Sequence, residues 1–183
     1  LLLEQPSLSA EVVGTTRLGR EIWLYRFGSG ATDREGRPRP AILINGGIHA
    51  REWQSPEVVT GLMELLALGQ DDDHWLSYLR DNVSVLMLPV QNIDGFLQTQ
   101  RYPRSNYLGS DPSSPAFAPR DGRMRRKNLL GADEDLFTAG DHLNGVDLNR
   151  NNAPFWAVTA DTALPTGLIY RGPGQASEPE TQA

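Results

Sequence analysis

Two residues that could bind a metal ion lie three positions apart in the first third of the chain, His49 and Glu52. They follow shortly after an apolar, strand-like run at residues 41–45. A neutral imidazole nitrogen and a carboxylate oxygen both suit zinc, and a catalytic zinc site has three protein ligands and one position open to water or substrate. The pair therefore accounts for two ligands and requires a third. On its own it is a weak signal, because the same spacing is common on solvated helix faces.

Four further motifs follow in order along the chain. They are Asn-Ile-Asp-Gly at 92–95, Arg-Met-Arg-Arg-Lys-Asn at 123–128, Gly-Val-Asp-Leu-Asn-Arg-Asn at 145–151 and Ser-Glu-Pro-Glu-Thr at 177–181, with Tyr170 and Gly172 before the last. With His49 and Glu52 they resemble the zinc metallocarboxypeptidases of the carboxypeptidase A and B type. Several motifs in the right order are much harder to produce by chance than one. The chain is thereby identified as the N-terminal part of such a catalytic domain.

The resemblance implies a metal and substrate role for five of these residues. His49 and Glu52 would be ligands of one Zn²⁺ per domain, and Asp147 would support the imidazole, as carboxylates commonly do for ligating histidines. Asn149 and Arg150 would bind the free C-terminal carboxylate of a peptide, because a guanidinium fork matches a carboxylate and an amide adds one directed hydrogen bond. Without the resemblance, Asp147 could equally be a loop carboxylate that caps backbone N–H groups.

Two more arginines acquire roles from the same resemblance. Arg126 would polarise the scissile carbonyl and stabilise the oxyanion that forms there. The arginines at 123 and 125 are alternatives, and the Lys-Asn pair that follows residue 126 favours Arg126. Arg51 corresponds to the outer carboxylate-binding arginine of the family.

Similar proteins carry their third zinc ligand, a His, after the 177–181 motif, and their general base Glu and a substrate-binding Tyr later still. The chain ends at Ala183. Of its other histidines, His74 lies in an acidic, amphipathic stretch and His142 in a loop without a ligand-like partner at short spacing, and both are interpreted as structural or solvated. We therefore expect a fragment that lacks the third ligand and the base, and that is inactive as a peptidase by itself.

Two other functions remain open. One is a related zinc amidohydrolase or deacylase, although a substrate without a terminal carboxylate would not need Asn149 and Arg150. The other is a carboxylate-binding module that has no catalytic activity. The expected partners are the C-termini of peptides or proteins, and neither nucleic acid nor a membrane.

Composition limits the remaining classes. The 183 residues suit a single domain with a sizeable core, here at 1–183. A net charge of −6 argues against general nucleic-acid binding, and no apolar run approaches the length of a membrane span. Cysteine is absent, which leaves the redox compartment open. The resemblance favours a secreted or periplasmic location.

The hydrophobic pattern predicts an α/β fold with a mixed central β-sheet flanked by helices. Strands are expected at 11–16 and 21–27, as an antiparallel pair, and at 83–90. The run at 41–44 is continuous and apolar, which is typical of a central strand buried on both faces. One helix should begin with Ser55 as its cap and continue to Gly69, a shorter one should cover 73–80, and 102–121 should be a long loop.

Overall fold

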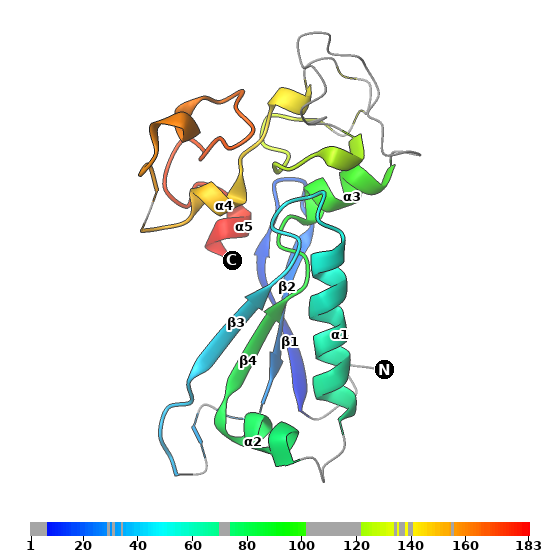
Figure 1. The fold of residues 1–183 in the computed structure, drawn as a ribbon, viewed down its shortest axis with the longest axis vertical. Coiled ribbons are helices and arrows are strands. Elements are labelled where there is room, and N and C mark those ends of the chain that lie inside the picture. The colour runs from blue at the N-terminus through cyan, green and yellow to red at the C-terminus, as the bar shows by residue number, and fades with distance from the viewer. Residues whose placement is uncertain are drawn as a thin grey trace. The chain divides into compact units, whose positions relative to one another are not determined.

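A computed structural model describes residues 7–28, 30, 32–33, 35–69, 74–101, 122–133, 135, 138, 141–154 and 156–183 (Figure 1). Contacts divide the chain into two compact units. The sheet unit comprises residues 1–13, 23–46 and 54–89, and the loop unit comprises residues 14–22, 47–53 and 90–183. The long loop expected at 102–121 and the side chain of His142 lie outside the described residues.

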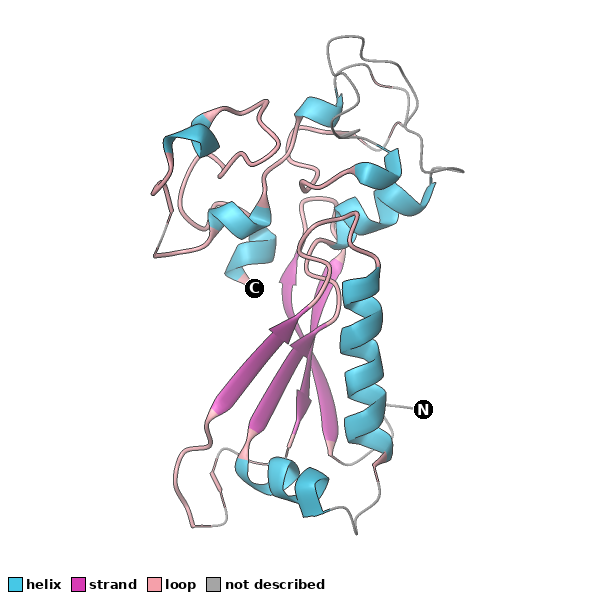
Figure 2. Cartoon of the chain, viewed as in Figure 1, coloured by secondary structure: helices cyan, strands magenta, loops and turns pink. Residues whose placement is uncertain are grey.

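The strands form one four-stranded mixed sheet, in the order β1-β2-β4-β3 (Figure 2). They are β1 (Leu8–Thr15), β2 (Glu21–Phe27), β3 (Ala41–Asn45) and β4 (Ser84–Leu88). A short turn joins β1 to β2, β2 pairs antiparallel with β4, and β3 pairs parallel with β4 along its whole length. This arrangement confirms the predicted α/β fold with a mixed sheet.

The environment predicted for β3 is wrong. The apolar run was expected to be buried on both faces, but β3 lies at the edge of the sheet, with β4 as its neighbour among the described residues. Leu43 is 62% exposed and Ile42 50% exposed. An apolar run indicates that a strand could be buried. Whether it is buried depends on which strands and helices lie beside it.

The long helix α1 (Gln54–Leu68) begins one residue before the predicted cap, Ser55. It buries Val59, Met63, Leu66 and Ala67 in a cluster that also contains Phe27, Val85 and Met87 from the sheet. Apolar residues recur at helical spacing in the sequence at 58, 59, 62, 65 and 66, but Val58 and Leu65 are exposed. The buried face of α1 is therefore rotated from the one that this spacing predicts.

Shorter helices complete the described structure. They are α2 (His74–Asn82), close to the predicted second helix, and α3 (Ile93–Arg101), α4 (Leu148–Asn151) and α5 (Pro179–Gln182), with 3-10 turns at Gly122–Met124, Asp141–Leu143 and Ala160–Ala163. None of the described helices has the length and apolarity needed to cross a membrane.

Replacing Met87 should reveal how much the sheet unit depends on its core. The side chain has no exposed surface, so Met87→Ala should lower the free energy of unfolding by about 2–5 kcal/mol through lost burial and a residual cavity. Leu43→Ala, at the exposed edge strand, should change it by about 0.5 kcal/mol or less. Urea denaturation of both variants checks this, and equal effects would contradict the burial described for the two side chains.

Candidate metal and carboxylate-binding site

The predicted zinc ligands meet in a tight turn of the loop unit. The N–H of Glu52 donates to the carbonyl oxygen of His49 over 3.1 Å, and this bond closes the turn. As a result Nδ1 of His49 lies 2.8 Å from Oε1 of Glu52. The imidazole is buried, while the carboxylate is about half exposed at 45%. The two predicted donor atoms therefore converge at a point that solvent can reach.

The other nitrogen of the imidazole faces a buried carboxylate. Nε2 of His49 lies 3.2 Å from Oδ1 of Asp147, which is within ion-pair distance but outside the angular range of a good hydrogen bond. Asp147 itself has no exposed surface. Its other oxygen, Oδ2, accepts from Nε of Arg126 over 2.9 Å and lies 2.9 Å from a terminal nitrogen of the same guanidinium.

Asp147 also begins a helix. It is the N-cap of α4, and its Oδ1 accepts from the backbone N–H of Asn149 over 3.0 Å. Burial on its own would raise the pKa of Asp147, but the contact with His49 and the charge of Arg126 outweigh it and lower that pKa. The carboxylate is therefore held in its charged form, and the same residue caps α4 and lies beside the imidazole of His49.

The donor set fits zinc as far as it goes. Both ring nitrogens of His49 lie beside a carboxylate, Nδ1 beside Glu52 and Nε2 beside Asp147. A metal bound by Nδ1 and Glu52 would need the proton of the ring to be on Nε2, beside Asp147. Nδ1 and the Glu52 oxygen are the donor types that zinc prefers. Within the described ranges no group of three or more His, Cys, Asp or Glu side chains is placed to hold a metal, and His49 and Glu52 would account for two ligands of the predicted site.

Adjacent arginines in the 123–128 motif have different environments. Arg125 is 1% exposed and donates to the backbone carbonyls of Asn128 and Asn144 over 3.0 and 3.1 Å. Arg126 is partly exposed and reaches Asp147. Of these two arginines, Arg126 is the one that lies beside the turn of His49 and Glu52. It is also the one that the Lys-Asn pair in the sequence favoured.

The predicted carboxylate-binding pair lies on α4. Asn149 is exposed, and Arg150 is half-buried and donates to the carbonyl of Asn149 over 3.1 Å. Both line a cavity of about 510 Å³, together with Asn152, Ala153, Ala157, Val158, Thr159, Asp161, Thr162 and Ile169. Arg51 is half-buried in the turn between the two predicted zinc ligands. Two side chains that suit a carboxylate thus face an open space.

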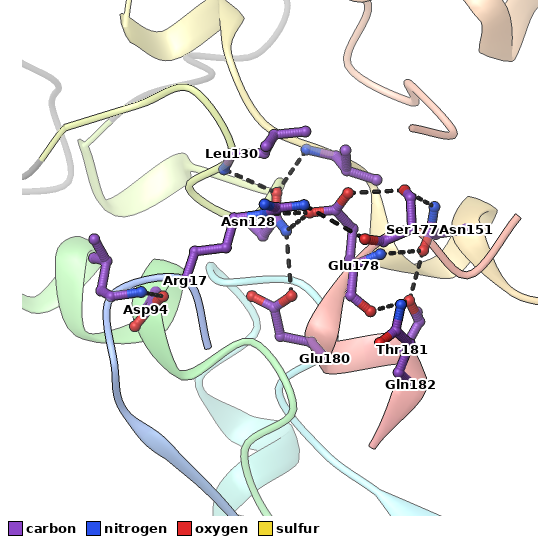
Figure 3. Close-up of polar contacts among 12 residues, drawn as sticks. Arg17, Asp94, Asn128, Leu130, Asn151, Ser177, Glu178, Glu180, Thr181 and Gln182 are labelled. Carbon is purple, nitrogen blue, oxygen red and sulfur yellow. Dashed lines mark hydrogen bonds and ion pairs between the residues drawn. The ribbon is translucent and has the colours of Figure 1, made fainter. Parts of the chain in front are cut away.

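A buried asparagine connects the segments that carry these residues (Figure 3). Oδ1 of Asn128 accepts from the N–H of Val146 over 2.7 Å and from that of Leu130 over 3.2 Å. Its Nδ2 donates to Glu178 over 2.8 Å and lies 3.4 Å from Glu180. Because Val146 precedes the helix cap Asp147, Asn128 ties the start of α4 to the 177–181 motif.

A second buried asparagine anchors the other end of α4 (Figure 3). Nδ2 of Asn151 donates to Ser177 Oγ and to the carbonyls of Arg171 and Gly174 over 2.8–3.0 Å. Its Oδ1 accepts from the N–H of Glu178 and the hydroxyl of Thr181. The side chain directly after Asn149 and Arg150 is therefore fixed on all its polar atoms.

The carboxylates of the 177–181 motif are buried, whereas the sequence by itself predicts only the start of a helix there. Glu178 has no exposed surface and lies 3.3 Å from Nε of Arg17. Burial is the largest cause that raises the pKa of Glu180, and the charges of Glu178 and Asp94 raise it further, whereas a backbone hydrogen bond and the amide of Asn128 lower it by less than burial raises it. Sequence reasoning missed Asn128, Asn151 and both glutamates as structural residues, because single polar residues carry no periodic signal.

A family model described as zinc carboxypeptidase matches residues 2–183, and the chain belongs to that family. The chain is 30% identical over 181 residues to carboxypeptidase B of Homo sapiens, covering 98% of this chain and 36% of that protein. It is 31% identical over 182 residues to carboxypeptidase B of Astacus astacus, covering 98% and 49%. The chain thus spans between about a third and a half of these relatives.

Solved structures agree on the fold. Carboxypeptidase A from Helicoverpa armigera matches with a TM-score of 0.69 at 25% identity, over 98% of this chain and 37% of that one. Thrombin activatable fibrinolysis inhibitor matches with a TM-score of 0.72 at 23% identity, over 99% and 39%. Both are carboxypeptidase-type folds, as the motifs predicted.

The raised pKa of Glu180 gives a pH test of the buried network. A carboxyl whose folded-state pKa is raised contributes stability that is fully present below its ordinary value of 4.5 and is lost as pH rises through the folded-state value. Glu180→Gln removes this loss, so the variant should gain stability relative to the parent as pH rises from 4 to 8. Urea denaturation across that range measures the difference. Glu64→Gln, on the exposed side of α1, is the control; parallel curves for Glu180→Gln and the parent would contradict the assignment.

Proposed function

We propose that this chain supplies part of the catalytic site of a zinc-dependent carboxypeptidase, which hydrolyses the C-terminal peptide bond of peptides and proteins. The observation that carries the proposal is the position of Asp147. Its buried carboxylate lies beside the imidazole of the His–Glu turn, binds Arg126, and caps the helix that presents Asn149 and Arg150 to an open cavity. One buried carboxylate thus links the candidate metal ligand His49 and the candidate oxyanion donor Arg126 to the helix that carries the candidate carboxylate clamp.

His49 and Glu52 would hold one zinc ion per domain, through Nδ1 and the side-chain carboxylate. Zinc in such a site polarises a carbonyl and lowers the pKa of bound water. Asp147 would keep the proton on Nε2 and fix the plane of the ring, which is the usual task of a carboxylate behind a ligating His.

The substrate would be held by its own chain end. Asn149 and Arg150 would bind the terminal carboxylate, with Arg51 as an outer contact for the same group during entry. A charge-assisted, two-point contact of this kind orients the last peptide bond as well as binding it. The same pair argues for a peptidase over a deacylase, since a substrate without a terminal carboxylate would leave Arg150 without its partner.

Arg126 would stabilise the charge that develops on the scissile carbonyl oxygen. A guanidinium has five N–H donors, and two of its nitrogens are directed at Asp147, so N–H groups remain for a further acceptor. Because Asp147 fixes the arginine before substrate arrives, little reorganisation is needed when charge develops.

Hydrolysis requires a third ligand and a general base in addition to these residues. We expect the 183-residue chain alone to lack peptidase activity, and a polypeptide that adds both groups to be active. Release of C-terminal residues by the 183-residue chain, dependent on zinc, would overturn the first expectation. A secreted or periplasmic location stays a prediction.

The clamp can be tested with peptides that differ only at the chain end. In the full-length protein, zinc-dependent hydrolysis should be fast with a free C-terminus and at least about tenfold slower with an amidated one, since a charged hydrogen bond contributes about 1.5–3 kcal/mol. Arg150→Ala should lower kcat/KM for the free peptide by about 10–100-fold and abolish the discrimination. Arg150→Lys, which keeps the charge without the fork, should fall between.

Arg37→Ala removes an exposed arginine of the sheet unit and serves as the matched control. Equal hydrolysis of free and amidated peptides by the parent would instead favour a deacylase. Tight binding of free C-termini without hydrolysis would favour a binding module.

Asp147→Asn tests the support of the imidazole. The amide lacks the negative charge that the carboxylate places beside the His49 ring and Arg126. Zinc affinity should therefore fall about 10–100-fold. Competition with a fluorescent chelator measures it. Asp141→Asn, a buried carboxylate beside Arg125, is the comparison, and an equal loss in both variants would point to general destabilisation.

A further inference from the structure

Ala50, between the two predicted metal-binding residues, is held on three sides within the loop unit. It has no exposed surface, and its N–H donates to the carbonyl of Arg126 over 3.1 Å. Its carbonyl oxygen lies 3.3 Å from Oγ1 of Thr99 on α3. A Cβ added to Gly95 would lie 2.9 Å from the Ala50 methyl group, so α3 approaches this residue as closely as a glycine allows.

Trp53, directly after Glu52, is held by the same helix. Its Nε1 donates to Oγ1 of Thr99 over 2.8 Å. Its ring meets the ring of Phe96 edge-on, with centroids 6.5 Å apart and an angle of 70°. The guanidinium of Arg123 lies 5.3 Å from the ring centroid, at cation–π distance. Ala50 inside the turn and Trp53 directly after it are therefore both anchored to α3.

Both anchors meet at one fully buried hydroxyl. Thr99 Oγ1 accepts from Trp53 and has a single hydrogen to donate. The carbonyl of Phe96, at 2.6 Å, is the stronger acceptor of that hydrogen, and the carbonyl of Ala50, at 3.3 Å, the weaker. The firmest bond from Thr99 to the turn is therefore the one that it accepts from the indole.

We propose that Thr99 is a positioning residue for metal binding, whose buried hydroxyl holds the turn so that the donor atoms of His49 and Glu52 converge. The inference rests on the proposed zinc role of those two residues. Within the turn, the N–H of Glu52 bonds the carbonyl of His49 and the two side chains lie 2.8 Å apart, and the contacts of Ala50 and Trp53 with α3 add to this order from outside. Ordering the ligands before the metal arrives removes an entropic penalty from binding.

If Thr99 only stabilised the fold, its substitution would change a different measured quantity. Its bond to the carbonyl of Phe96, three residues earlier, stabilises α3 whether or not a metal binds. Thr60 provides a matched comparison, because its hydroxyl bonds the carbonyl of Pro56 within α1 over 2.9 Å and belongs to the sheet unit. A residue that only stabilises a helix should change the melting temperature and leave zinc affinity unchanged.

The test measures zinc affinity of the full chain by competition with a fluorescent chelator, beside the melting temperature without zinc. Thr99→Val keeps the shape and removes the hydroxyl, and it should weaken zinc binding about tenfold. Thr99→Ser should restore binding close to the parent value. Thr60→Val should lower the melting temperature comparably and leave zinc affinity unaltered.

Trp53→Phe removes the indole donor while Thr99 stays intact, so it keeps the test valid if Thr99→Val does not fold. It should weaken zinc binding by a similar factor. The double variant of Thr99→Val and Trp53→Phe should bind zinc no more weakly than either single variant, because both lose the same bond.

His49→Ala separates the proposed zinc site from the proposed positioning role of Thr99. If it abolishes binding while Thr99→Val and Trp53→Phe bind zinc like the parent, the positioning role is overturned and the zinc site stands. If His49→Ala binds zinc like the parent, both are overturned.

Discussion

The loop unit depends on one buried negative charge, the carboxylate of Asp147. A carboxylate without solvent contact is unfavourable unless charges and hydrogen bonds compensate it, and here the compensation comes from three separate segments. They contribute the imidazole of His49, the guanidinium of Arg126 and the first turn of α4. Each group that Asp147 needs for its own burial is also a candidate for binding metal or substrate. Folding of the loops and assembly of the site are therefore the same event.

Polar contacts take the place of an extended apolar core in this unit. The buried residues of the described loops are largely polar, and the best connected are Asn128, Asn151, Glu178 and Lys127. Hydrogen bonds are directional, so a fully satisfied network specifies one arrangement, whereas apolar packing tolerates several. The sheet unit, by contrast, is held by an apolar cluster around Met87 and α1.

The sequence predicted the bounds of strands and helices well where the pattern depends only on neighbouring residues. β2 matches its predicted bounds, and β4 and α2 were found nearly in place, because alternation and helical spacing depend on the residues themselves. The exposure of β3 was mispredicted, because burial depends on neighbours that the strand does not encode. The four residues of α4 are too few for a periodic signal. His49, Glu52 and Arg126 came from motif resemblance. Asn128 and Asn151 lie in the same motifs, but nothing in the sequence assigned them their structural roles.

The motif at 123–128 shows how burial divides neighbouring cations among different tasks. Lys127 donates to the carbonyls of Leu143, Pro165 and Gly167, and Arg125 to other loop carbonyls, so both charges are committed to holding the chain. Arg126 lies between them but is partly exposed and pairs with Asp147. A cation that saturates buried carbonyls cannot leave them without exposing an unsatisfied backbone group, which is unfavourable. Of these three, Arg126 is therefore the cation that suits the proposed contact with a substrate oxygen while the loops around it stay folded.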